Sequence, residues 1–203
     1  GIPLKNRCSI GYLYNDNINT LEEVKEDIKN IFSQYNLIAS DDTNSFTFGN
    51  YYRRKNYNGR IIYNGNASFF LEPLEATSVG VMDHIQRTAC DLWHNNTNED
   101  TANLKYKQLI EQIETVIMLH YYSGSRYKTD FWQFAQERAI KCIENSTKDI
   151  NFIKVYTESK VGETANLCNG TFEYGLWHSG AFNQNIKGLG IEKELDNLVF
   201  GVD

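Results

Sequence analysis

Residues 63–81 read YNGNASFFLEPLEATSVGV, and this stretch carries the signals for a strand, a turn and a helix in succession. An apolar strand at residues 60–63 leads into a turn of small residues at 64–68, and the buried-looking segment Phe69–Leu71 follows. Apolar or small side chains then recur at helical spacing at Ser78, Met82, Ile85, Ala89 and Leu92. We therefore expect a strand, a turn and a helix, with Thr77 or Ser78 as the N-cap residue.

Two glutamates in this stretch allow two interpretations. Glu72 and Glu75 arrive at a helix start, whose free N–H groups can hold an anion. The same pattern also fits a capped helix behind a core strand, with acidic residues placed to suit the helix dipole. The residue pattern alone favours the capped helix, because caps are far commoner than sites.

Composition limits the classes of protein that fit the chain. Its 203 residues are 41% hydrophobic and 13% aromatic, enough for the core of one domain or of a large piece of one. The net charge is −6 and the one basic run is Arg53–Lys55, which argues against a nucleic-acid partner. No apolar run approaches the length of a membrane span. The four cysteines are far apart, as expected of free thiols in a reducing cytoplasm.

The predicted fold class is α+β, with strands in the N-terminal part and a mostly helical second half. We expect strands near residues 7–14, 45–53 and 60–64, and helices after Thr20 and over about 77–95, 99–122 and from 129. Thr20 and Glu23 form a capping-box pattern. The chain divides into a strand-rich region at 1–75, with one helix, and a mainly helical region at 76–203.

A metal site is not expected. Cys90 and His94 lie one helical turn apart, which is compatible with two ligands of one ion. Without a second pair of ligands, ordinary packing is the preferred interpretation.

Four blocks of the sequence resemble one enzyme family. Residues 70–78, FLEPLEATS, closely resemble the Glu-Pro-Leu-Glu-Ser-Thr segment of flavin-dependent tryptophan halogenases. The other blocks, in the family's order, are Ile2-Pro3 with Gly11–Tyr14, then Leu119–Trp132, then Phe172–Ile191. Because the resemblance touches almost the whole chain, we interpret it as the C-terminal part of a halogenase with a flavin-monooxygenase-like fold.

The resemblance implies a chemistry and residues for it. Such enzymes use FAD from a separate flavin reductase, and chloride or bromide attacks the flavin peroxide to give hypohalous acid, which halogenates an aromatic substrate. Glu75 matches the catalytic glutamate, and the N–H groups of Thr77 and Ser78 match the halide site. Asn66 and Val79 match positions that touch the flavin.

The resemblance also implies a substrate slot of aromatic side chains. It places Tyr121, Tyr122, Phe131 and Trp132 around the ring of the substrate. Lys128 stands where the family has an acid, so a group suited to a ligand ammonium has become a cation, which argues against free tryptophan. Ala76 replaces the family's serine.

The dinucleotide-binding part of the family does not appear in this sequence. No Gly-x-Gly-x-x-Gly follows a strand, and the family's guiding lysine would lie before Gly1. We expect the isolated chain to hold FAD weakly, to be inactive and to form a dimer through apolar surface. Two alternatives remain open: a non-catalytic module for an aromatic ligand or a protein partner, and a related flavin monooxygenase.

Overall fold

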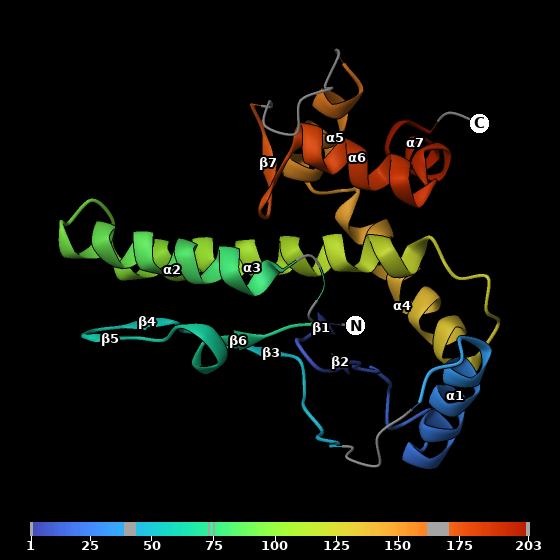
Figure 1. Cartoon of the computed structure of the whole chain (residues 1–203). Coiled ribbons are helices and arrows are strands. Elements are labelled where there is room, and N and C mark those ends of the chain that lie inside the picture. Colours follow the sequence, from blue (N-terminus) through green and yellow to red (C-terminus); the bar gives the residue numbers. More distant parts are fainter. Residues whose placement is uncertain (1, 39–43, 73, 75, 162–170, 202–203) are drawn as a thin grey trace. The chain divides into compact units, whose positions relative to one another are not determined.

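The computed structural model describes residues 2–38, 44–72, 74, 76–161 and 171–201 (Figure 1). It divides into two compact units. Unit 1 comprises residues 1–47 and 126–134, and unit 2 comprises residues 48–125 and 135–203. The division expected from sequence at residue 75 rests on the content of strands and helices, which is a different criterion from compactness. That division stays a prediction.

Unit 1 contains a short hairpin and one capped helix. Strand β1 (Ile2–Pro3) pairs antiparallel with β2 (Cys8–Ser9), and α1 spans Leu21–Gln34. The predicted capping box is present: Glu23 N–H donates to Thr20 Oγ1 at 3.3 Å, and Thr20 N–H donates to the Glu23 carboxylate at 2.8 Å. The strand expected over residues 7–14 is only two residues long.

Three small antiparallel pairs of strands belong to unit 2. They are β3 (Tyr51–Tyr52) with β6 (Phe69–Phe70), β4 (Tyr57–Asn58) with β5 (Ile61–Ile62), and β7 (Glu173–Tyr174) with β8 (Trp177–His178). Tyr51 lies opposite Phe70 and Tyr57 opposite Ile62. The one-turn helix η1 (Gly65–Ala67) connects the hairpin to β6. Strands occur where they were expected near 45–53 and 60–64, but they are shorter.

Helices supply most of unit 2 and its core. They are α2 (Thr77–Trp93), α3 (Glu99–Tyr122), α4 (Asp130–Ser146, whose first turns belong to unit 1), α5 (Ile150–Lys160), α6 (Ser179–Leu189) and α7 (Glu192–Phe200). Figure 1 shows α2 running beside α3. The core centres on α3, with Tyr106, Ile110, Ile113 and Val116 fully buried. The chain is therefore α+β with helices dominant. None of the helices in the described part of the chain has the length and apolar character needed to cross a bilayer.

The start of α2 corrects one prediction. Neither Thr77 nor Ser78 is the N-cap, because the helix begins at Thr77 and its N-cap is Ala76, which provides no side-chain hydrogen bond. The buried row is Thr77, Val81, Ile85 and Thr88, one residue away from the expected row except at Ile85. Small and apolar side chains occupy two adjacent rows of this helix, so packing rather than spacing selects the buried one.

Candidate functional site

At the start of α2, several polar groups make long hydrogen bonds or none within the described residues. Thr77 is 2% exposed, yet its Oγ1 has no hydrogen-bond partner among the described residues. The Thr77 N–H reaches the Leu74 carbonyl oxygen only at 3.4 Å, and within the described residues the Ser78 N–H makes no hydrogen bond. Because buried polar groups are normally paired, these donors are suited to a small anion at the positive end of the helix. Glu75 and Pro73 lie outside the described residues.

Backbone strain marks the residue before this helix. Ala76 has φ +52° and ψ +27°, the left-handed conformation that an L-residue with a Cβ adopts at a cost of about 1 kcal/mol. Such strained residues concentrate at functional sites, where surrounding structure holds them. The left-handed conformation of Ala76 turns the chain into α2 immediately before Thr77 and Ser78, the two candidate halide-binding residues.

The turn at η1 is held by hydrogen bonds to its carbonyl groups. The Tyr51 hydroxyl donates to the Asn66 carbonyl, and Arg53 Nε donates to the Ala67 carbonyl at 2.5 Å. The Arg53 guanidinium also stacks on the Tyr63 ring, 3.8 Å from its centroid. These contacts fix the turn against β3 and leave the Asn66 side chain exposed to solvent.

The same turn lies beside α2. Asn64 Nδ2 donates to the Met82 carbonyl at 3.4 Å, and a Cβ built on Gly65 would lie 3.5 Å from Met82 Sδ. Gly65 has φ +54°, which glycine adopts without strain. The fold therefore brings η1 and α2 together, and Asn66 and Val79 both remain exposed, Val79 at 65%.

A buried polar network supports the turn from behind. Ser68 Oγ donates to Asn56 Oδ1 at 2.6 Å and lies 2.8 Å from the Tyr106 hydroxyl of α3. Asn103 Oδ1 accepts the N–H groups of Asn56 and Tyr57 at 2.7 and 3.0 Å. Its Nδ2 donates to the carbonyls of Tyr57 and Glu99 at 2.8 and 3.0 Å. The amide of Asn103 therefore makes all four hydrogen bonds it can make.

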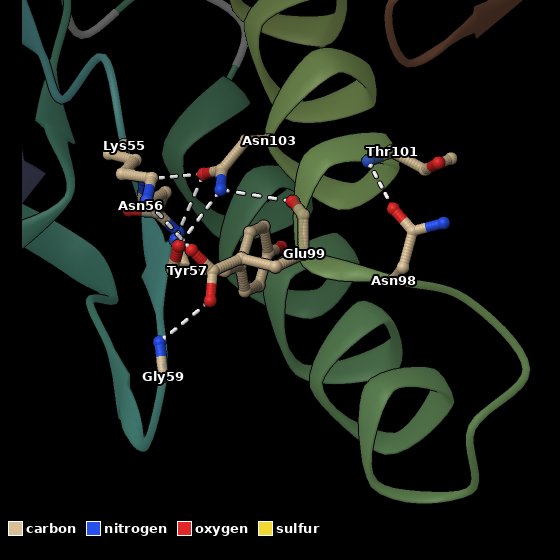
Figure 2. Close-up of polar contacts among 8 residues, drawn as sticks. All are labelled: Lys55, Asn56, Tyr57, Gly59, Asn98, Glu99, Thr101 and Asn103. Carbon is tan, nitrogen blue, oxygen red and sulfur yellow. Dashed lines mark hydrogen bonds and ion pairs between the residues drawn. The ribbon is translucent and has the colours of Figure 1, made fainter.

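Figure 2 shows how this network fastens the β4–β5 hairpin to the start of α3. Asn103 faces the strand, and the Glu99 carboxylate accepts the Gly59 N–H at 2.8 Å and pairs with Lys55 Nζ at 2.9 Å. These partners, the Gly59 N–H first, lower the pKa of Glu99. The hairpin, the turn and β6 are thus held in one position on α3.

A cavity of about 340 Å³ lies between the β3 segment and α3. Its lining residues are Asn50, Tyr51, Tyr52, Arg54, Leu71, Glu72, Glu114, Ile117, Met118 and Arg138. Tyr121 lies about one turn of α3 beyond Ile117 and Met118, and its hydroxyl donates to the Glu72 carboxylate. Burial first, and then this carboxylate, raise the pKa of Tyr121 well above its ordinary value. The first glutamate of the central stretch is therefore engaged by a tyrosine of the predicted substrate slot.

The four predicted slot residues fall into two pairs. Tyr121 and Tyr122 are half-buried at the end of α3 in unit 2. Phe131 and Trp132 belong to unit 1, with ring centroids 5.5 Å apart in an edge-to-face contact. Each pair is described within its own unit, so a common slot stays a prediction.

Comparison with known proteins decides the family. The family profile described as "Tryptophan halogenase" matches residues 1–199. The chain belongs to the tryptophan halogenase family. It is 21% identical over 198 residues to tryptophan 7-halogenase RebH of Lentzea aerocolonigenes, an alignment that covers 94% of this chain and 37% of the relative. The chain thus spans well under half the length of that relative, and no solved structure matches it.

Several supporting residues of this tryptophan halogenase chain were not found from sequence. Asn56, Asn103 and Tyr106 are buried polar residues with partners 12 to 47 positions away along the chain. The one available signal was Asn103, a poor helix former inside a long helical pattern. Among the described residues, no group of three or more histidine, cysteine and acidic side chains could hold a metal ion.

Proposed function

We propose that this chain forms part of a flavin-dependent halogenase that acts on an aromatic substrate. The observation that carries the proposal is the family match over residues 1–199. The physical support is the start of α2, where a buried hydroxyl and weakly used N–H groups meet the positive end of a helix. A halide needs such donors and no charged side chain.

The proposed roles rest on the resemblance to the family and are supported by the local geometry of α2 and η1. Thr77 and Ser78 hold the halide, and Glu75, which lies outside the described residues, directs the halogenating species toward the ring. Asn66 lies on η1 and Val79 on α2, and these two elements are in contact. Both side chains are exposed and are suited to contact the edge of a flavin ring. Bound reduced flavin, with oxygen, supplies the oxidising equivalent that turns halide into hypohalous acid. The residues of this chain bind and orient the halide and the arene.

Bromide binding tests this proposal directly. We expect anomalous diffraction from bromide-soaked crystals to show one ion near the N–H groups of Thr77 and Ser78. Thr77→Val keeps the shape of the side chain, removes the hydroxyl and should weaken bromide binding about fivefold, as expected for one lost hydrogen bond to an ion. Thr88→Val, on the same buried row of α2, is the matched control and should not change it. A well-ordered helix start without bromide would overturn the halide assignment.

We also propose that the chain self-associates as a homodimer and that it holds FAD weakly on its own. The support is the exposure of large apolar side chains in unit 1, such as Ile38 at 98% and Ile2 at 65%. Light scattering and a flavin titration test the two statements. A monomer that binds FAD at micromolar concentration would contradict both.

A further inference from the structure

The cavity beside β3 combines an apolar floor with charged walls. Leu71, Ile117 and Met118 line it and are 8%, 3% and 5% exposed, so they form a buried apolar floor. A volume of about 340 Å³ lies at the lower end of the range for small-molecule sites. It is large enough for one ring system and too small for a dinucleotide.

The charges around this floor are not equally available. The Glu72 carboxylate already accepts the Tyr121 hydroxyl. The Glu114 carboxylate pairs with Arg138 Nη2 at 3.3 Å. Arg54, in contrast, has no ion pair with any residue that the structure describes. The cavity therefore offers an unused cation, while each of its two acids already has a partner.

We propose that this cavity binds a small ring-bearing molecule that carries a carboxylate and no ammonium group. The ring lies on the apolar floor, where burial of its surface supplies most of the affinity. The carboxylate pairs with the Arg54 guanidinium, whose planar fork matches it in two parallel hydrogen bonds. This goes beyond the proposed halogenation, because the binding needs neither flavin nor halide.

A ligand ammonium is disfavoured by the same arrangement. To pair with Glu72 it would have to displace the Tyr121 hydroxyl, and to pair with Glu114 it would have to displace Arg138. Near Arg54 it would meet a like charge. A neutral ring fits the floor but leaves the Arg54 guanidinium without a partner.

Three ligands with one ring system and different charges test the proposal. They are indole-3-acetate, indole and tryptamine, titrated against the whole chain by calorimetry at low ionic strength. We expect indole-3-acetate to bind about fivefold more tightly than indole, and tryptamine to bind most weakly. The advantage of the acid should shrink at high salt, because Arg54 is exposed. Failure of indole-3-acetate to bind, or equal binding of tryptamine, would overturn the proposal.

The chain provides an internal reporter of where the ligand lies. It has only two methionines, Met82 and Met118. Met118 lines the cavity, whereas Met82 is on α2 beside η1. With ¹³C-methyl methionine, the ring current of bound indole-3-acetate should shift the Met118 signal and leave Met82 unchanged. A shift of Met82 alone would place the ligand elsewhere and would overturn the assignment.

Three charge variants separate Arg54 from a general electrostatic effect. Arg54→Gln should weaken indole-3-acetate about fivefold, whereas Arg60→Gln, an exposed arginine on the β4–β5 hairpin, should have no effect. Glu114→Gln should strengthen it about twofold, because it releases Arg138 from its ion pair. Equal effects of the two arginine variants would overturn the role of Arg54. The bromide experiment is independent of these titrations, so the halogenase proposal and this one can fail separately.

Discussion

The two units of the chain differ in how they cover their apolar side chains. In unit 2, large side chains such as Tyr106, Phe152 and Phe182 are completely buried in one continuous core. Among the described residues of unit 1, Val24 is the only buried hydrophobic side chain, and Phe46 is 80% exposed. Tertiary packing therefore stabilises unit 2, whereas caps and a short hairpin stabilise the elements of unit 1.

This difference bears on function. The candidate halide-binding helix start, the turn at η1 and the cavity all belong to unit 2, where a rigid core supports them. Phe131 and Trp132 belong to unit 1. A precise site for a small ion is therefore expected in the well-packed unit.

The largest expected effect is the loss of a core ring. Phe152→Ala should lower the free energy of unfolding of unit 2 by about 3–5 kcal/mol, because it removes a fully buried side chain and leaves a cavity. Phe46→Ala is the matched change in unit 1 and should lower the free energy of unfolding of unit 1 by less than about 0.5 kcal/mol. Urea denaturation followed by circular dichroism measures both. Similar losses would show that unit 1 has a core after all.

The next largest effect concerns the Asn103 hydrogen-bond network that joins the β4–β5 hairpin to the start of α3. Asn103→Ala should lower the free energy of unfolding by about 2–4 kcal/mol, because it leaves the buried N–H groups of Asn56 and Tyr57 without an acceptor. Asn98→Ala removes only the exposed N-cap bond to Thr101, drawn in Figure 2, and should lower it by about 1 kcal/mol. Denaturant melts of the two variants compare them. Equal losses would make Asn103 an ordinary helix residue.

Relief of strain at Ala76 should act in the opposite direction. Ala76→Gly should raise the free energy of unfolding by about 0.5–1 kcal/mol, because glycine adopts φ +52° without a Cβ clash. Ala89→Gly, inside the same helix, should lower it by about 1 kcal/mol. Thermal unfolding of both variants measures the contrast. A destabilised Ala76→Gly protein would mean that the left-handed conformation carries no strain.

The smallest expected effect is a pH dependence at the β7–β8 hairpin. Partial burial opposes the shift, but the N–H groups of Phe172 and Thr171 donate to the Glu158 carboxylate and lower its pKa to about 2. A lowered carboxyl pKa contributes stability that is present above about pH 4.5 and is lost as the pH falls toward 2. Water screens this group, so the loss is about 0.5 kcal/mol.

Substitution checks the sign of that dependence. Glu158→Gln should remove the change in stability between pH 4.5 and 2 that this carboxylate contributes, and Glu173→Gln, on the hairpin itself, should keep it. Urea melts at several pH values measure the difference. Stability that rises on acidification through this range in the wild type alone would contradict the assignment.

Sequence alone was sufficient to predict α1, α2, α3, the start of α4 and the family, whereas α5, α6 and α7 were not located from it. The Thr20–Glu23 capping box and the bounds of α3 depend on residues within a few positions of each other, so local spacing was sufficient. The blocks shared with the tryptophan halogenases are likewise contiguous segments. Local pattern could not choose between adjacent rows of α2. The predicted cap at Thr77 or Ser78 was wrong because the helix begins at Thr77, directly after Ala76 in the left-handed conformation.

The contacts between side chains that are distant in sequence depend on the tertiary structure. Glu72 and Tyr121 are 49 positions apart, and Asn103 holds Asn56 across 47 positions. Sequence periodicity does not reveal such pairs, because their formation depends on how β4, β6 and α3 pack. The cavity has the same origin. Within the part of the chain that the structure describes, Arg54 has no ion pair and the Thr77 hydroxyl has no hydrogen-bond partner, because packing by distant segments decides which polar groups are paired and which stay available for a ligand.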